Sequence, residues 1–221
     1  MQETSKKPAL RFAGFNDAWE QREFRDSFDL LANNTLSRAE LNDESGIALN
    51  VHYGDILVKF GEMIDLAVDH LPYINDPAKV NKSAALQNGD VIIADTAEDS
   101  TVGKCSEIAG IYGKLVVSGL HTIPCRPRKK FAPGYLGYFM NSPAYHDQLL
   151  PLMQGTKVTS VSKSALEDTL LCYPVDTEEQ TLIGRYFMKL EDLITLHQRE
   201  YFKQQMEVKN AKYNQRDGPV L

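Results

Sequence analysis

Cysteine is scarce in this sequence: Cys105, Cys125 and Cys172 are the only three among 221 residues. Their number is odd, they lie far apart and no two form a CxxC pair, so the sequence indicates neither a disulfide framework nor a cysteine zinc site. Long apolar runs are also missing, because no stretch approaches the roughly 20 residues that cross a bilayer. The N-terminal residues MQETSKKPALRF contain no apolar signal segment. We therefore expect a protein of the reducing cytoplasm.

An excess of positive charge is missing as well. The chain carries 24 Lys and Arg against 30 Asp and Glu, a net charge of −6. Residues 1–175 carry 17 basic against 22 acidic side chains, and residues 176–221 carry 7 against 8, so neither part is basic. A nucleic-acid partner would therefore need a local basic patch, or other subunits that supply positive charge.

Catalytic motifs are absent too. The sequence has no GxSxG, HExxH or Walker motif, no GxGxxG after a strand, and no NPPF-like stretch. The acids Asp95, Glu98 and Asp99 could bind a hard metal ion, but acidic loop residues are more often solvated or capping groups. The five histidines are scattered, and His121 lies in a strand-like run where a hydrogen-bonded structural role is expected. We predict that the protein is not an enzyme and binds no metal or cofactor.

What the sequence does contain is many short apolar runs separated by turn residues. Three runs have the length and the Val/Ile content of strands: GDILVKF (54–60), GDVIIAD (89–95) and KLVVSGLHTI (114–123). Two of them begin with Gly-Asp, which predicts a turn before each strand. Residues 132–153 have helical spacing, with Pro143 separating two short helices. We predict an α+β fold, with a mixed globular domain over residues 1–175.

A long helix is predicted to follow, over residues 176–216, with a short tail at 217–221. No Gly or Pro occurs between Arg185 and Asp217. Asp176 precedes Glu179 by three residues, and Thr177 precedes Gln180 likewise, and either pair fits a capping box. A helix from Thr177 to Asn214 would have 38 residues and a length of about 57 Å.

This helix carries an apolar seam whose positions alternate in steps of four and three, as in a coiled coil. The seam consists of Ile183, Phe187, Leu190, Ile194, His197, Tyr201, Gln204, Val208 and Ala211. Packing on its own domain is one alternative. However, the helix exceeds the usual 10–14 residues or so, and a domain of 175 residues is only roughly 30–40 Å across. We therefore predict a dimer interface, in which His197 fixes the register or the choice of partner, made by Ile183, Phe187, Leu190, Ile194, His197, Tyr201 and Val208.

Three polar or basic loops are candidates for DNA contact: LANNTLSR (31–38), CRPRKKF (125–131) and GTKVTSVSKS (155–164). Their cationic, amide and hydroxyl groups suit phosphate oxygens and base edges. The candidate contact residues are Asn33, Asn34, Thr35, Arg38, Arg126, Arg128, Lys129, Lys130, Lys157, Thr159, Ser160 and Lys163. The alternative for each loop is an ordinary solvated surface.

Taken together and in order, several stretches resemble the specificity subunit of type I restriction–modification systems. The first is an RF-x-GF-x₃-WE pattern made by Arg11, Phe12, Gly14, Phe15, Trp19 and Glu20. The others are YGDI (53–56), GDVIIADTAEDSTVGKC (89–105), GLHTI (119–123), GTKVTSVSKSAL (155–166), the P-x₃-EEQ start of the helix at Pro174, and LITLHQRE (193–200).

The resemblance implies a protein without catalytic activity that recognises double-stranded DNA and holds methyltransferase subunits, joined by motor-nuclease subunits for restriction. Members of this family usually carry two recognition domains and two conserved helices that pair antiparallel. This sequence has one of each and therefore resembles half a subunit. A second copy would supply the missing half and give an inverted-repeat target in two parts, separated by the helix pair. The alternative is an assembly or regulatory protein that pairs with full-length specificity subunits and recognises no DNA itself.

Overall fold

The structure is a computed structural model that describes residues 8–216. Within this range the described part excludes the side chains of Ser83, Val208 and residues 210–216. The predicted tail, residues 217–221, and the Val208 side chain of the predicted dimer interface therefore lie outside what is described.

The chain divides into two compact units, Met1–Gly184 and Arg185–Leu221, and each is described by itself. The first unit combines short strands and short helices, so the predicted α+β class is confirmed. The predicted division at residue 175 between a recognition domain and a dimerisation helix concerns function and stays a prediction.

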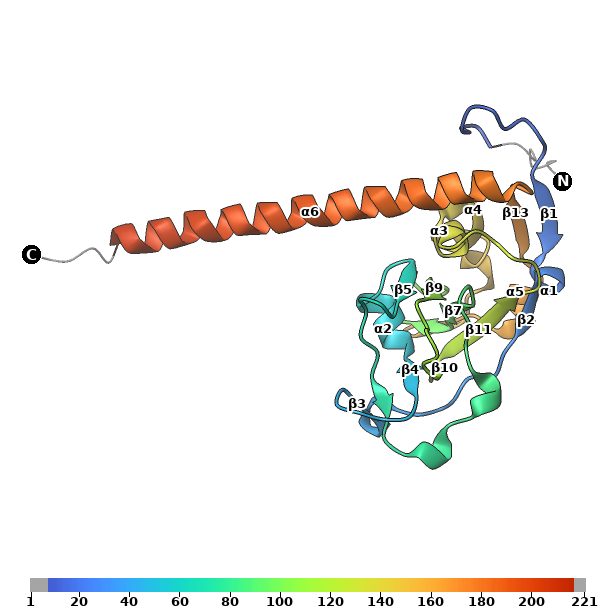
Figure 1. The fold of residues 1–221 in the computed structure, drawn as a ribbon, viewed down its shortest axis with the longest axis horizontal. Helices are drawn as coiled ribbons and strands as arrows, with labels where there is room; N and C mark the ends of the chain where they lie inside the picture. The colour runs from blue at the N-terminus through green and yellow to red at the C-terminus, as the bar shows by residue number, and fades with distance from the viewer. Residues whose placement is uncertain (1–7, 217–221) are drawn as a thin grey trace, which may run out of the picture. The chain divides into compact units, whose positions relative to one another are not determined.

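A five-stranded sheet forms the centre of the first unit (Figure 1). Its strands, in spatial order, are β2 (Phe28–Leu30), β11 (Thr122–Pro127), β7 (Val91–Ala94), β9 (Cys105–Ala109) and β5 (Met63–Asp65). Neighbours are antiparallel except β5 and β9, which are parallel. All four residues of β7 are buried, because Val91 and Ile93 point into one hydrophobic cluster while Ile92 and Ala94 point into another. Both faces of this sheet are therefore covered.

A second sheet has four strands, in the order β10 (Val116–Ser118), β4 (Leu49–Val51), β6 (Tyr73–Ile74) and β3 (Leu41–Asn42). Strand β10 runs parallel to β4, and β6 is antiparallel to both β4 and β3. Two further pairs are antiparallel: β1 (Glu20–Glu23) with β13 (Leu170–Tyr173), and β8 (Thr96–Ala97) with β12 (Thr159–Ser160).

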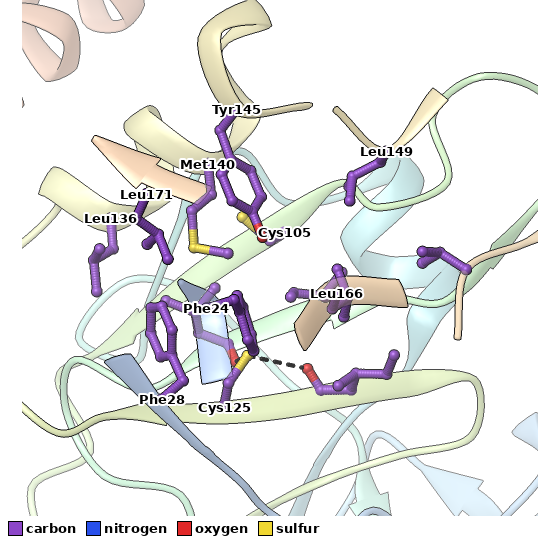
Figure 2. Packing of buried hydrophobic residues seen from close by; sticks show 14 of the residues in the cluster. Phe24, Phe28, Cys105, Cys125, Leu136, Met140, Tyr145, Leu149, Leu166 and Leu171 are labelled. Carbon is purple, nitrogen blue, oxygen red and sulfur yellow. Dashed lines mark hydrogen bonds between the residues drawn. The ribbon is translucent and has the colours of Figure 1, made fainter. Parts of the chain in front are cut away.

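Short helices cover the central sheet on both sides (Figure 1). The α-helices of this unit are α1 (Phe24–Ser27), α2 (Tyr53–Val58), α3 (Tyr135–Asn141), α4 (Pro143–His146) and α5 (Lys163–Glu167). The 3₁₀ helices are η1 (Arg38–Glu40), η2 (Pro77–Lys79), η3 (Lys82–Ala84) and η4 (Leu150–Leu152). Figure 2 shows the main cluster, in which Phe24, Met140 and Tyr145 pack with Cys105 and Cys125 of the sheet. Helix α2 covers the opposite face through Ile56.

The prediction of a strand over residues 54–60 is wrong, because most of this segment belongs to α2. The ring of His52 caps the helix, with Nδ1 accepting a hydrogen bond from Gly54 N–H at 3.2 Å. Ile56 and Phe60 are both buried while Val58 is exposed, so the apolar residues follow helical rather than strand spacing. The other predictions in this region are confirmed: residues 89–95 contain β7, Gly89 has the positive φ of a turn, and Pro143 starts a second helix.

The long helix is α6 (Thr177–Arg216), with 40 residues and a length of about 60 Å. Asp176 Oδ1 accepts from Glu178 N–H at 2.7 Å and so caps the helix as predicted. Glu179 does not close a capping box. Its buried carboxylate instead accepts from Arg11 Nε and Nη2 at 2.6 and 2.7 Å and from Trp19 Nε1 at 3.4 Å. The first turns of α6 are thereby fixed to the N-terminal part of the same unit.

The apolar seam of α6 divides between the two units. Ile183, predicted to lie in a dimer interface, packs partly against the hydrophobic cluster of the first unit. In the second unit, none of the described side chains from 185 to 207 is buried. The large apolar side chains exposed there are Tyr186, Phe187, Leu190, Leu193, Ile194, Leu196, Tyr201, Phe202 and Met206. Phe187, Leu190, Ile194 and Tyr201 are the predicted seam residues among them.

Candidate nucleic-acid interface

The turn between β10 and β11 brings one of the predicted polar loops into place. Asn34 N–H donates to Ser118 O at 2.9 Å, and Asn33 Nδ2 donates to Gly119 O at 3.2 Å. Thr122 Oγ1 donates to Gly119 O at 2.5 Å and closes the turn from within. The loop at residues 31–38 therefore lies along this turn, although 86 positions separate Asn33 from Gly119.

His121 lies in this turn rather than in a strand, so its predicted place in a strand-like run is wrong. Its φ is +53, and its side chain is about half exposed. The ring nitrogen Nδ1 lies 3.3 Å from Asp95 Oδ1 and 3.4 Å from Thr96 Oγ1. The polar partners of His121 therefore lie at the surface rather than in a core, and whether its role is structural or in binding a ligand stays a prediction.

The second polar loop reaches this turn through Asp95 and Thr96, the two residues beside His121 Nδ1. Ser160 pairs with Thr96 in the β8–β12 ladder, and Val161 N–H donates to Asp95 O at 2.9 Å. The hydroxyl of Thr159 donates to backbone oxygens at Ala97 and Asp99, which indicates a structural use. The structure thus brings the predicted loops 31–38 and 155–164 together around the β10–β11 turn.

An aromatic row and an ion pair complete this region. The ring centroids of His52 and Tyr53 are 4.7 Å apart, and those of Tyr53 and His121 are 5.2 Å apart with the rings nearly perpendicular. Arg38 Nη2 donates to Asp55 Oδ1 at 2.6 Å. Burial lowers the pKa of His52, with the charge of Arg38 acting in the same direction. We call the accessible part of this region the turn surface: Asn33, Arg38, Tyr53, Asp95, Thr96, His121 and Ser160.

The basic run at 125–131 lies toward the other end of β11, roughly 13 Å along the strand from Thr122. Arg126 forms two parallel bonds with Asp90, Nε to Oδ1 at 2.8 Å and Nη2 to Oδ2 at 2.7 Å. Asp90 is only 1% exposed, and its hydrogen bond raises the pKa of Arg126. Arg126 therefore neutralises a buried carboxylate of its own domain.

Two neighbours of Arg126 are also paired with acids. Arg128 Nε lies 2.9 Å from Asp29 Oδ1, and Lys129 Nζ lies 3.1 Å from Glu20 Oε2. Lys130 is exposed at the end of the run. Much of the positive charge that the sequence gathers here is balanced locally, and DNA contact by these residues stays a prediction.

The remaining predicted contact residues differ in their surroundings. Asn34 is used within the fold, since its Nδ2 donates to Asn50 Oδ1 at 2.6 Å and its Oδ1 accepts from Leu36 N–H. Exposed side chains are those of Thr35, Lys157 and Lys163. Sequence reasoning missed Tyr53, Asp95, Thr96 and His121 as site residues. The available signal was that YGDI, GDVIIADT and GLHTI, all stretches that carry the family resemblance, contribute these four residues.

The metal alternative finds no support in the described side chains. Among them, no three His, Cys, Asp or Glu residues are grouped so that they could hold a metal ion. Asp99 Oδ1 accepts from Thr101 N–H and Oγ1 at 2.8 and 2.5 Å, the local capping role considered above, and these bonds lower the pKa of Asp99. Within residues 8–216, no helix is both long and apolar enough to span a bilayer.

Comparison with known proteins gives matches at the level of the fold. No protein-family model and no curated protein matches the sequence. A chain from a structure on complex assembly and conformational transition of the type I restriction–modification system matches with a TM-score of 0.61 and 16% identity, over 95% of this chain and 47% of that chain. The type I S subunit from M. genitalium matches with a TM-score of 0.54 and 15% identity, over 87% and 44%. The HsdS subunit from Thermoanaerobacter tengcongensis matches with a TM-score of 0.52 and 18% identity, over 90% of this chain and 43% of that chain.

The chain therefore has the fold found in somewhat less than half of each of these proteins. The resemblance stated from the sequence is confirmed for the fold. The chain spans about half the length of the solved structures that it matches.

Proposed function

We propose that this chain is a DNA-recognition subunit of a type I restriction–modification complex and that each copy recognises one half-site. The observation that carries the proposal is the fold: nearly the whole chain matches a little under half of solved S subunits. The absence of catalytic motifs in the sequence agrees with a role in binding. The DNA contacts proposed are the turn surface and the exposed lysines Lys130, Lys157 and Lys163.

The missing half is supplied, in this proposal, by a second copy. The second unit carries Phe187, Leu190, Ile194 and Tyr201 as exposed apolar side chains on one face of a helix, a pattern typical of a coiled coil. Two copies related by a two-fold axis perpendicular to their helices would pair them antiparallel, the arrangement that the family resemblance implies. A spacer of this length favours half-sites more than one DNA turn, about 34–36 Å, apart. Two identical recognition domains would then select an inverted repeat.

The methyltransferase subunits are proposed as the main partners, with motor-nuclease subunits added for restriction. The chain itself has a net charge of −6, and much of its basic run is paired with acids. Phosphate contacts supply most of the affinity of DNA-binding proteins. We therefore expect weak DNA binding by the chain alone and tight binding only by the complex.

A second function has an observation in its favour. The chain has an excess of acidic residues, and Arg126 and Arg128 form ion pairs with Asp90 and Asp29. These features would also suit an assembly protein that pairs with full-length specificity subunits and recognises no DNA. Such a protein would still use the seam of α6.

Methylation mapping separates these two functions. Genomic DNA would be sequenced for modified bases from cells that carry this protein with the methyltransferase subunit of its own system, and from cells that carry that subunit alone. Recognition predicts new methylation at a bipartite inverted repeat. A protein that joins the methyltransferase in pull-downs but adds no methylated motif would be an assembly protein, and the proposal would be wrong.

A further inference from the structure

The turn surface contains a residue held in an uncommon backbone conformation. With φ at +53, His121 adopts the left-handed region that only a few per cent of non-glycine residues occupy. Asp95 N–H donates to His121 O at 3.1 Å and holds it there. Gly119 lets the chain approach closely, since a Cβ at this position would lie 2.5 Å from Asn50 Nδ2. Conformations of this kind persist where surrounding contacts impose them, and they concentrate at ligand-binding sites.

The neighbours of His121 also determine which nitrogen of the ring can meet a ligand. Thr96 Oγ1 donates a hydrogen bond to Asp95 Oδ1 at 2.7 Å. Both Thr96 Oγ1 and Asp95 Oδ1 are therefore acceptors toward His121 Nδ1. In the neutral imidazole the proton then lies on Nδ1, and Nε2 is a hydrogen-bond acceptor. Tyr53 restrains the ring from the side. The half-exposed ring is therefore oriented before any ligand binds.

One buried polar atom without a partner lies beside this turn, and a second belongs to Asp55 of α2. Among the described side chains the only such atoms are Asn50 Nδ2, Asp55 Oδ2 and Tyr135 Oη. Asn50 lies against Gly119, and Asp55 holds Arg38. Buried polar groups are nearly always hydrogen-bonded in native proteins, so these two atoms are exceptions within this domain.

The charge of the turn surface indicates which part of DNA it fits. The positive charge of Arg38 is balanced by Asp55, and His121 faces the carboxylate of Asp95. Phosphate oxygens would be repelled by an acid at the centre of the contact, whereas base edges offer both donors and acceptors. Amide, hydroxyl, phenol and imidazole groups around this acid therefore suit base edges in the major groove.

We propose that the turn surface recognises base edges of duplex DNA, and that His121 Nε2 accepts a hydrogen bond from an exocyclic amino group, adenine N6 or cytosine N4. Asp95 acts as a positioning residue that fixes the ring and its tautomer. This inference rests on the proposed function, because it names the residue that distinguishes one base pair within each half-site.

The test compares methylated motifs in genomic DNA from cells that carry the full-length protein and its methyltransferase. Asparagine tolerates a positive φ, so His121→Asn removes the imidazole with little backbone cost. We expect one A·T or C·G position in each half-site to lose about 5- to 100-fold of its discrimination, while the other positions keep theirs. Asp95→Asn should relax the same position to a smaller extent. It also serves as the test if His121→Asn does not fold.

His70→Asn is a matched control. His70 is also about half exposed, and its Nε2 lies 3.7 Å from Asp43 Oδ1. The ring centroids of His70 and Tyr73 are 6.3 Å apart, but His70 does not belong to the turn surface. It should leave the motif unchanged. An unchanged motif in folded His121→Asn, or equal loss at every position, would overturn the inference while the wild-type motif still supports the proposed function. If the wild type gives no motif, the proposed function itself fails and the inference fails with it.

Discussion

Arg126 is one of four positive side chains that the sequence gathers between residues 125 and 131, and both of its bonds to Asp90 lie within one domain. Removing the guanidinium would leave the buried carboxylate of Asp90 without its counter-charge. We therefore predict that Arg126→Ala lowers the free energy of unfolding by roughly 2–4 kcal/mol, somewhat less than the roughly 3–5 kcal/mol for fully buried pairs because Arg126 is partly exposed. Urea unfolding of the purified protein measures this change.

Arg128→Ala provides the comparison, because the Arg128–Asp29 pair is exposed on both sides. Exposed pairs usually contribute less than about 1 kcal/mol, so this variant should unfold almost as the wild type does. Equal stability of the two variants would show that Asp90 does not depend on Arg126. A DNA-binding defect of Arg126→Ala is consequently informative only after its folding has been measured, whereas Arg128→Ala tests DNA contact directly.

The sequence predicts which loops of the candidate site are polar, but not which partners their individual side chains contact. The sequence indicates that Asn33 and Arg38 lie in a polar loop. It cannot indicate that Asn33 meets Gly119 or that Arg128 meets Asp29, because 86 and 99 positions separate these pairs. His121 was missed for a related reason: its run has strand-like composition, and the interruption by a turn with positive φ depends on Gly119 and Asp95.

At the scale of elements, composition predicted most segments and failed where two periodicities overlap. Residues 89–95 and 132–153 behave as their patterns predict, since a buried strand and short helices divided by proline have distinct signals. Residues 54–60 do not. Ile56 and Phe60 fit a helical face as well as a strand in so short a run, and His52 decides the outcome by capping the helix.

The junction between β9 and α3 gives a prediction about pH. Glu107 of β9 accepts from the N–H groups of Gly134, Leu136 and Gly137 at the start of α3. Burial raises the pKa of Glu107 to about 7 from an ordinary value of 4.5. When the pKa of a carboxyl group is higher in the folded than in the unfolded state, proton binding favours the folded state. This contribution is fully present below the unfolded-state pKa and is lost as the pH rises through 7. We expect the free energy of unfolding to fall between pH 5 and pH 8, by up to roughly 3 kcal/mol.

Glu107→Gln isolates this effect, because the amide does not titrate. Chemical unfolding at several pH values should give a steeper fall for the wild type than for the variant over the same interval. The stability of Glu107→Gln at any single pH is not the readout, since the amide also changes the bonds to α3. Parallel pH profiles would mean that the three backbone donors keep Glu107 ionised throughout.

At the scale of the whole molecule, the sequence predicted a long helix and an apolar seam, and α6 confirms the helix over Thr177–Arg216. The use of its first turns was not predictable. Glu179 and Gln180 read as capping residues, but they bind Arg11 and Ala132, partners that only the folded domain brings near. Ile183 likewise packs on the domain core although it has the correct spacing for the seam. The proposed interface between copies is accordingly confined to the second unit.

The pairing of that unit with a second copy is tested by two acidic substitutions on the seam. Leu190→Asp with Ile194→Asp would place four carboxylates in the proposed dimer interface, where an unpaired charge is costly to bury. We expect the wild type to sediment as a dimer and the double variant to dissociate with a dimer Kd raised at least about 100-fold, with an unchanged melting transition of the globular unit. Leu196→Asp with Phe202→Asp is the matched control, because both side chains are exposed and apolar but lie off the seam. Loss of the dimer in the control as well, or a seam variant that remains dimeric, would exclude this face of α6 as the interface between copies.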